Sequence, residues 1–88
     1  MKIIYVIIAT AFVNNEWDSS WITKRENFGS KEACEERLIQ KWNNKELMPG
    51  LENLTRVSIE KDWRVKLTFS DPLRNEKVLQ TCAYLQVK

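Results

Sequence analysis

Two segments at opposite ends of the chain are apolar at most positions, which is typical of strands in the middle of a sheet. The first runs from Ile3 to Val13 and is rich in Ile and Val, residues that fit a pleated sheet. The last runs from Lys77 to Val87 and has apolar side chains on both of its faces. Because such strands must be covered on both sides, we expect the two segments to be neighbours at the sheet centre.

Two further segments alternate between apolar and polar residues, as half-buried strands do. The segment 17–25 places Trp17 and Trp21 on one side and Ile22 on the other. The segment 56–69 alternates with one continuous parity. It is either one long bent strand or a hairpin that turns near residues 61–62, and the absence of glycine there leaves both alternatives open.

One helix is predicted over about residues 31–43. Ser30 is a good N-cap, because its hydroxyl can accept a hydrogen bond from a backbone N–H of the first turn. Cys34, Leu38 and Trp42 recur at a spacing of four residues and form one apolar stripe on an otherwise charged helix.

The order of these elements predicts an α+β fold, with a mainly antiparallel sheet of four to five strands and one helix (about 31–43) packed on one face. The 88 residues are enough for one domain, 1–88. One short helix cannot cover both faces of a sheet whose central strands are apolar on both sides. The connecting segment 45–53, the tryptophans or another copy of the chain must cover the second face. We expect a homodimer, because two-fold self-association is the commonest arrangement of soluble oligomers.

The charge pattern argues against several classes of partner. The 14 basic and 12 acidic side chains are interleaved and leave a net charge of +2. A protein that binds nucleic acid or a membrane surface more often has a clear excess of one sign, so we do not expect a nucleic-acid partner. The apolar run at the N-terminus is shorter than the roughly 20 residues that a membrane-spanning helix needs.

The composition also excludes the common catalytic arrangements. The chain has no histidine, which removes the commonest general base and metal ligand. With two glycines it cannot form a phosphate-binding loop. Three carboxylate pairs are expected to be solvated surface: Glu16 and Asp18, Glu35 and Glu36, Glu60 and Asp62. We therefore predict no enzyme, no catalytic residue, no cofactor and no metal site.

The two cysteines and the N-terminal segment bear on the compartment. Cys34 and Cys82 are either buried free thiols or a disulfide between the helix and the last strand, and a reactive Cys34 thiol is a third alternative. Residues 1–11 are either part of the first strand, in a cytoplasmic protein, or a signal peptide cleaved near Ala11, in an exported one. The β-rich composition of the run favours the strand and the cytoplasm.

A candidate binding surface lies in the segment 56–69. Arg56, Arg64 and Lys66 share one parity and Trp63 stands beside them, and basic residues next to an aromatic ring can bind single-stranded nucleic acid. The alternative is a solvent-facing strand with Trp63 in the core. The sequence thus predicts a small non-catalytic accessory or protein-interaction domain. A single-stranded nucleic-acid-binding module and a secreted, disulfide-stabilised domain are the alternatives.

Overall fold

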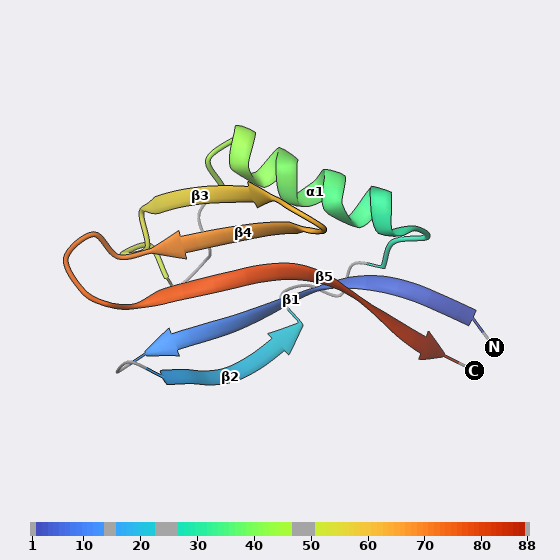
Figure 1. Cartoon of the computed structure of the whole chain (residues 1–88), viewed down its shortest axis with the longest axis horizontal. Coiled ribbons are helices and arrows are strands. Elements are labelled where there is room, and N and C mark those ends of the chain that lie inside the picture. Colours follow the sequence, from blue (N-terminus) through green and yellow to red (C-terminus); the bar gives the residue numbers. More distant parts are fainter. Residues whose placement is uncertain (1, 14–15, 23–26, 47–50, 88) are drawn as a thin grey trace.

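The computed structural model of the protein describes residues 2–13, 16–22, 27–46 and 51–87. Over these ranges one helix packs against an antiparallel sheet, which confirms the predicted α+β fold (Figure 1). The elements in chain order are β1 (Lys2–Val13), β2 (Glu16–Ile22), α1 (Lys31–Asn43), β3 (Arg56–Lys61), β4 (Val65–Ser70) and β5 (Lys77–Val87). The sequences Asn14-Asn15 and Pro49-Gly50 are typical of turns. Both lie outside the described residues, as does the predicted end of the second strand at residues 23–25.

The five strands of the sheet lie in the order β2-β1-β5-β4-β3. The first and last strands, β1 and β5, pair with each other from Lys2↔Val87 to Phe12↔Lys77. This confirms that the two segments with apolar residues on both faces are neighbours inside the sheet. Each has a second partner only over part of its length, since β2 pairs with residues 8–13 of β1 and β4 pairs with residues 77–81 of β5.

The segment 56–70 is a hairpin, so the alternative of one long bent strand is wrong. β3 and β4 pair from Arg56↔Ser70 to Lys61↔Val65. The turn between them is closed by the backbone N–H of Asp62, which donates to the carbonyl oxygen of Arg64 at 3.2 Å.

The helix α1 has the predicted bounds and the predicted N-cap. The hydroxyl oxygen of Ser30 accepts a hydrogen bond from the backbone N–H of Ala33 at 3.1 Å. The predicted apolar stripe is wrong at its last position, because Lys41 is 6% exposed whereas Trp42 is 39% exposed. At 100° per residue, Lys41 lies about 40° from the midpoint of Cys34 and Leu38, whereas Trp42 lies about 60° from it. The buried side of α1 therefore turns toward Lys41 at the end of the helix.

The core lies between α1 and the sheet. Its buried members come from every element except β2 and β3, and they are Ile7, Ala9, Cys34, Leu38, Leu54, Val65, Leu67, Phe69 and Val78. Leu51 packs against this cluster as well, so the described end of the 45–53 connection lies on the helix side of the sheet. That part of the connection does not cover the second face.

A bulge in the β1–β2 hairpin places Trp17 and Trp21 on opposite faces of the sheet, so the prediction that they share one side is wrong. The register shifts between Thr10 and Phe12, which pair with Ser20 and Trp17, respectively. Two residues that are paired on neighbouring strands point to the same face of the sheet. Because the bulge adds one residue to β2, Trp17 shares a face with Ser20, and Trp21 lies on the opposite one. A sequence pattern of strict alternation cannot show this extra residue.

Candidate binding surfaces

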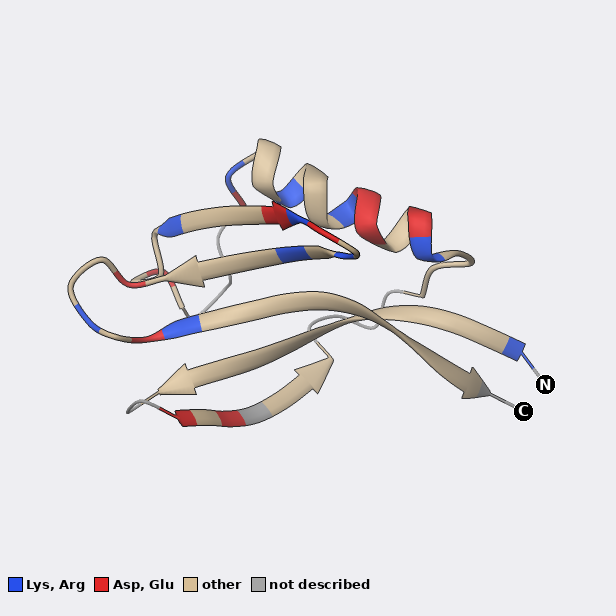
Figure 2. Ribbon diagram, viewed as in Figure 1, with Lys and Arg blue, Asp and Glu red and all other residues tan. Residues whose placement is uncertain are grey.

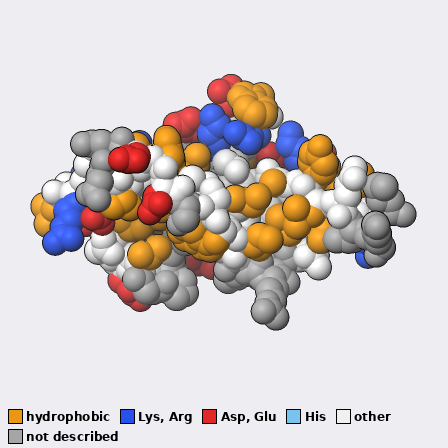
Figure 3. Space-filling model, turned by 90° about the horizontal axis from the view of Figure 1, so that it is seen from below, with side chains coloured by type: hydrophobic (Ala, Val, Ile, Leu, Met, Phe, Trp, Pro, Cys, Tyr) orange, Lys and Arg blue, Asp and Glu red, His pale blue; other side chains and the backbone are white. Residues whose placement is uncertain are grey.

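The side of the sheet away from α1, here called the open face, is apolar over three of its strands. Core residues occupy the odd positions of β1, so the even positions point to the open face. Register partners extend this assignment to β2 and β5. The apolar side chains that point to this side are Ile4, Val6, Ile8, Phe12, Trp17, Ile22, Leu79, Ala83 and Leu85. Trp17, Ile22 and Leu85 are exposed, whereas Val6 is buried. Seen from below, with α1 on the far side, hydrophobic side chains form a band across the middle of the molecule (Figure 3).

The remaining two strands make the other half of the open face polar. Its side chains are Arg56, Ser58 and Glu60 of β3, and Lys66, Thr68 and Ser70 of β4. In contrast, β1 and β5 carry charged residues only at their starts (Figure 2). The open face is therefore divided into an apolar half over β2, β1 and β5 and a polar half over β4 and β3.

An aromatic cluster lies at one corner of the apolar half. The rings of Phe12 and Trp17 meet edge to face with centroids 5.0 Å apart. The Nζ of Lys77 lies 4.9 Å from the ring centroid of Phe12 and 5.7 Å from that of Trp17. The ammonium group thus covers the rings by cation–π contact and marks the edge of the apolar area.

The two cysteines are joined in the structure by a disulfide between α1 and β5. The Cα atoms of Cys34 and Cys82 are 6.1 Å apart, and neither residue is a free thiol. Cys34 is completely buried in the core. The bond holds the first half of the helix against the central part of the sheet.

The candidate residues Trp63, Arg64 and Lys66 come together, whereas Arg56 does not join them. The guanidinium carbon of Arg64 lies 4.3 Å from the ring centroid of Trp63, and the Nζ of Lys66 lies 5.8 Å from it. Arg56 is paired with Ser70 at the other end of the hairpin, four residues from Lys66 along the ladder and thus roughly 13 Å away. Trp63 is 67% exposed, so the alternative that places it in the core is wrong.

A groove of about 430 Å³ lies beside this cluster. It is lined by Tyr5, Lys31, Trp63, Arg64, Cys82, Ala83 and Tyr84. Two cations and no carboxylate stand among these lining residues. The Nε of Arg64 is buried, and no described residue accepts a hydrogen bond from it. The groove can therefore receive an anionic group against aromatic walls.

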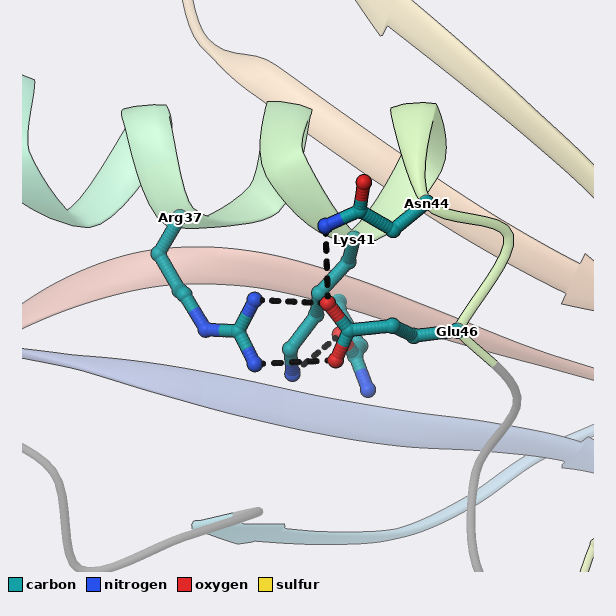
Figure 4. Close-up of polar contacts among 5 residues, drawn as sticks. Arg37, Lys41, Asn44 and Glu46 are labelled. Atoms are coloured by element: carbon teal, nitrogen blue, oxygen red, sulfur yellow. Dashed lines mark hydrogen bonds and ion pairs between the residues drawn. The ribbon is translucent and has the colours of Figure 1, made fainter.

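A polar cluster under the helix was not predicted from the sequence. The Nζ of Lys41 donates to the Oε1 of buried Gln80 at 3.3 Å. Beside it, the guanidinium of Arg37 makes two hydrogen bonds of 2.9 Å to the carboxylate of Glu46, as Figure 4 shows. The bidentate pair ties α1 to the segment that follows it. The position of Lys41 on the drifting apolar stripe is the signal that could have revealed the cluster.

The carboxylates of the three pairs named above have different surroundings in the structure. Glu35 accepts a hydrogen bond from the backbone N–H of Val65, and Glu60 lies across from Lys66. Glu16 and Asp18 are exposed on β2. In the part of the chain that the structure describes, no three His, Cys, Asp or Glu side chains could hold a metal ion together.

Comparison with known proteins gives no further evidence of function. No family model, no curated protein and no solved structure matches this chain. Among the described residues, α1 is the single helix, and it is neither long nor apolar enough to cross a membrane.

Proposed function

We propose that the protein is a non-catalytic interaction domain that works as a homodimer, in which the apolar halves of two open faces pack against each other. The observation that carries this proposal is the open face itself, which exposes large apolar side chains on the side of the sheet opposite to the core. Ile22 is 48% exposed and Trp17 is 51% exposed on this face. Contiguous exposed apolar patches of this kind mark association surfaces in soluble proteins.

The dimensions of the open face suit a small dimer interface. The apolar half spans three strands about 4.8 Å apart and on average about ten residues long, which gives roughly 14 by 33 Å, or roughly 480 Å² in projection. Side-chain relief makes the accessible area larger than the projection. Two apolar halves give roughly 950 Å² in projection, which approaches the roughly 1,200 Å² that the smallest stable interfaces bury.

The division of the open face favours a second copy as the occupant. The apolar half is centred on β1, so a two-fold axis near β1 would place this half against itself. The charged residues of β3 and β4 would then stay at the solvated rim. Two sheets packed in this way form a sandwich with a spacing of about 10 Å.

The mass of the protein in solution tests the proposal. At micromolar concentration, light scattering is expected to give twice the 10.4 kDa of one chain. Ile22→Lys places a charge in the proposed interface and is expected to weaken the dimer at least tenfold. Leu73→Lys is the matched control, because Leu73 is 92% exposed in the loop between β4 and β5 and lies outside the face. A monomeric mass for the unmodified protein contradicts the proposal.

The structure also bears on the compartment, where we propose a full-length chain with an intact disulfide, in place of the cytoplasmic protein expected from the sequence. Cleavage near Ala11 would remove most of β1, including the core residues Ile7 and Ala9. The disulfide, in turn, supports an oxidising compartment. Intact mass after alkylation without reduction is expected to show the full chain without alkyl groups. Two alkyl groups, or a chain shortened by eleven residues, would contradict this.

A further inference from the structure

The strand β5 extends beyond its neighbour β4 and leaves part of its edge without a partner strand. β4 pairs with β5 from Ser70↔Lys77 to Lys66↔Thr81 and no further. β5 continues to Val87 with β1 on its other side. Residues 82–87 are called the free edge here, because no described strand pairs with them on the β4 side. In Figure 1, β1 and β5 run together past the end of β4 toward the two termini.

A side chain of the helix ends the β4–β5 ladder at this point. The register that pairs Lys66 with Thr81 would next pair Val65 with Cys82. Instead, the backbone N–H of Val65 donates to the Oε2 of Glu35 at 3.0 Å. The backbone group that would continue the ladder therefore already has a partner, and β5 goes on alone.

The backbone of the free edge presents hydrogen-bonding groups outward. Tyr5 exchanges two hydrogen bonds of 3.0 and 2.9 Å with Phe28, on the side of β1 away from β5. In an antiparallel pair, a residue whose N–H and C=O point away from its partner strand faces a residue whose groups also point away. Tyr84 lies opposite Tyr5. Its N–H and C=O, and by alternation those of Cys82 and Gln86, therefore point out of the free edge.

The free edge lacks the features that usually protect an exposed strand edge. Natural proteins block such edges with charged residues, proline or bulges. Residues 78–87 contain no charged residue and no proline. Their pairing with β1 is continuous, with no register shift. The free edge is thus suited to accept one more strand.

The groove beside the free edge indicates the chemistry of that strand. Tyr84 belongs to both the free edge and the groove, and Arg64 and Lys31 supply the two cations of the groove wall. We propose that the free edge binds an extended segment of a partner protein by β-strand addition, and that Arg64 and Lys31 receive an acidic side chain of this segment. A segment of six residues would cover the free edge, and its side chains would alternate between the groove and the opposite side.

A second copy of the chain fits this edge less well than an acidic segment does. The β5 strand of another copy carries no carboxylate, so edge-to-edge pairing would bring no acidic side chain to the cations of the groove. The proposed dimer also uses the open face, which leaves the free edge accessible in both copies. The two sites can therefore be tested separately.

The test is a nuclear magnetic resonance titration with two synthetic peptides. The first is acetyl-Thr-Val-Glu-Val-Thr-Val-amide, and the second has lysine in place of glutamate. The acidic peptide is expected to bind at least tenfold more tightly than the basic one. It is also expected to slow the exchange of the amide hydrogens of Tyr84 and Gln86 at least tenfold. Equal affinity for the two peptides, or unchanged exchange at these amides, overturns the proposal.

Two pairs of variants separate backbone pairing from side-chain contact. Tyr84→Pro removes an outward N–H that does not bond to β1, and it is expected to lower the affinity for the acidic peptide at least tenfold. Tyr84→Ala keeps this N–H and is expected to lower the same affinity about threefold. Arg64→Gln is expected to abolish the preference for glutamate, whereas Arg74→Gln, in the exposed β4–β5 loop, should preserve it. If Tyr84→Pro fails to fold, the exchange measurement on the unmodified protein still decides. A dimer that Tyr84→Pro dissociates and Ile22→Lys does not would assign the edge to a second copy and overturn the proposal.

Discussion

Reduction of the Cys34–Cys82 disulfide is expected to remove a large part of the stability of the domain. The bond joins two residues that are 48 positions apart in the sequence. In the chain-entropy model, a cross-link across such a loop lowers the entropy of the unfolded chain by about 13.6 cal/mol/K, or about 4 kcal/mol at 25 °C. Domains of this length have a total stability of about 5–10 kcal/mol, so the loss would be about 40–80% of it.

The assay is urea unfolding of the same chain in its oxidised and reduced forms, followed by tryptophan fluorescence. Comparing two redox forms of one sequence avoids the cavity that a substitution of completely buried Cys34 would leave. The reduced form is expected to unfold with a free energy lower by about 4 kcal/mol, and with a midpoint temperature lower by roughly 15–30 °C. The oxidised form is expected to have the smaller denaturant slope, because its unfolded state is more compact.

The control is the double variant Cys34→Ala/Cys82→Ala, whose stability should not respond to the reductant. A difference below about 1 kcal/mol between the two redox forms of the unmodified chain would contradict a stabilisation of the domain by loop closure, because the loop-entropy term alone is about 4 kcal/mol. A double variant that responds to the reductant would show that the reductant acts on something other than this bond.

Three further predictions concern the Lys41–Gln80 hydrogen bond, the Asp71 carboxylate and binding of nucleic acid. In a double-mutant cycle of Lys41→Met and Gln80→Leu, urea unfolding should give a coupling of at least about 0.5 kcal/mol, and additive effects would show that their hydrogen bond contributes nothing. The backbone N–H of Leu73 and further hydrogen bonds lower the pKa of Asp71, so its contribution to stability is present above about pH 4 and lost as the pH falls below that value. Asp71→Asn should therefore reduce the fall of the unfolding free energy with pH below about pH 4. An unchanged fall would contradict the lowered pKa of Asp71. The protein should not bind oligothymidine at 50 mM salt, and a salt-sensitive affinity that Trp63→Ala abolishes would favour the nucleic-acid alternative.

The parts of the fold that were predicted depend on composition and periodicity. The central strands β1 and β5 could be recognised because each is apolar on both faces, whereas a strand at the sheet edge usually carries more polar residues. The helix could be bounded because Ser30 supplies a cap and the apolar stripe has a helical period. The buried Lys41 and the bulge of β2 were missed, since they depend on a drift of a few tens of degrees and on one extra residue.

The candidate surfaces were less predictable than the fold. Two cysteines are compatible with a bond and with free thiols, and only the distance between α1 and β5 distinguishes them. The grouping of Trp63, Arg64 and Lys66 followed from parity, whereas the separation of Arg56 follows from the hairpin register. The free edge depends on β5 being longer than β4, which the predicted segments 77–87 and 56–69 already indicate, and on the contact between Glu35 and Val65, which has no sequence signal.

Contacts between two copies of the chain test the proposed dimer most directly. In a mixed sample of isotope-labelled and unlabelled protein, isotope-filtered nuclear Overhauser spectra report only on contacts between different copies. Intermolecular contacts are expected to the methyl groups of Ile8, Ile22 and Leu79 on the open face. Contacts confined to Cys82, Tyr84 and Gln86 of the free edge, or to α1, in a sample with the mass of a dimer would contradict the proposed dimer.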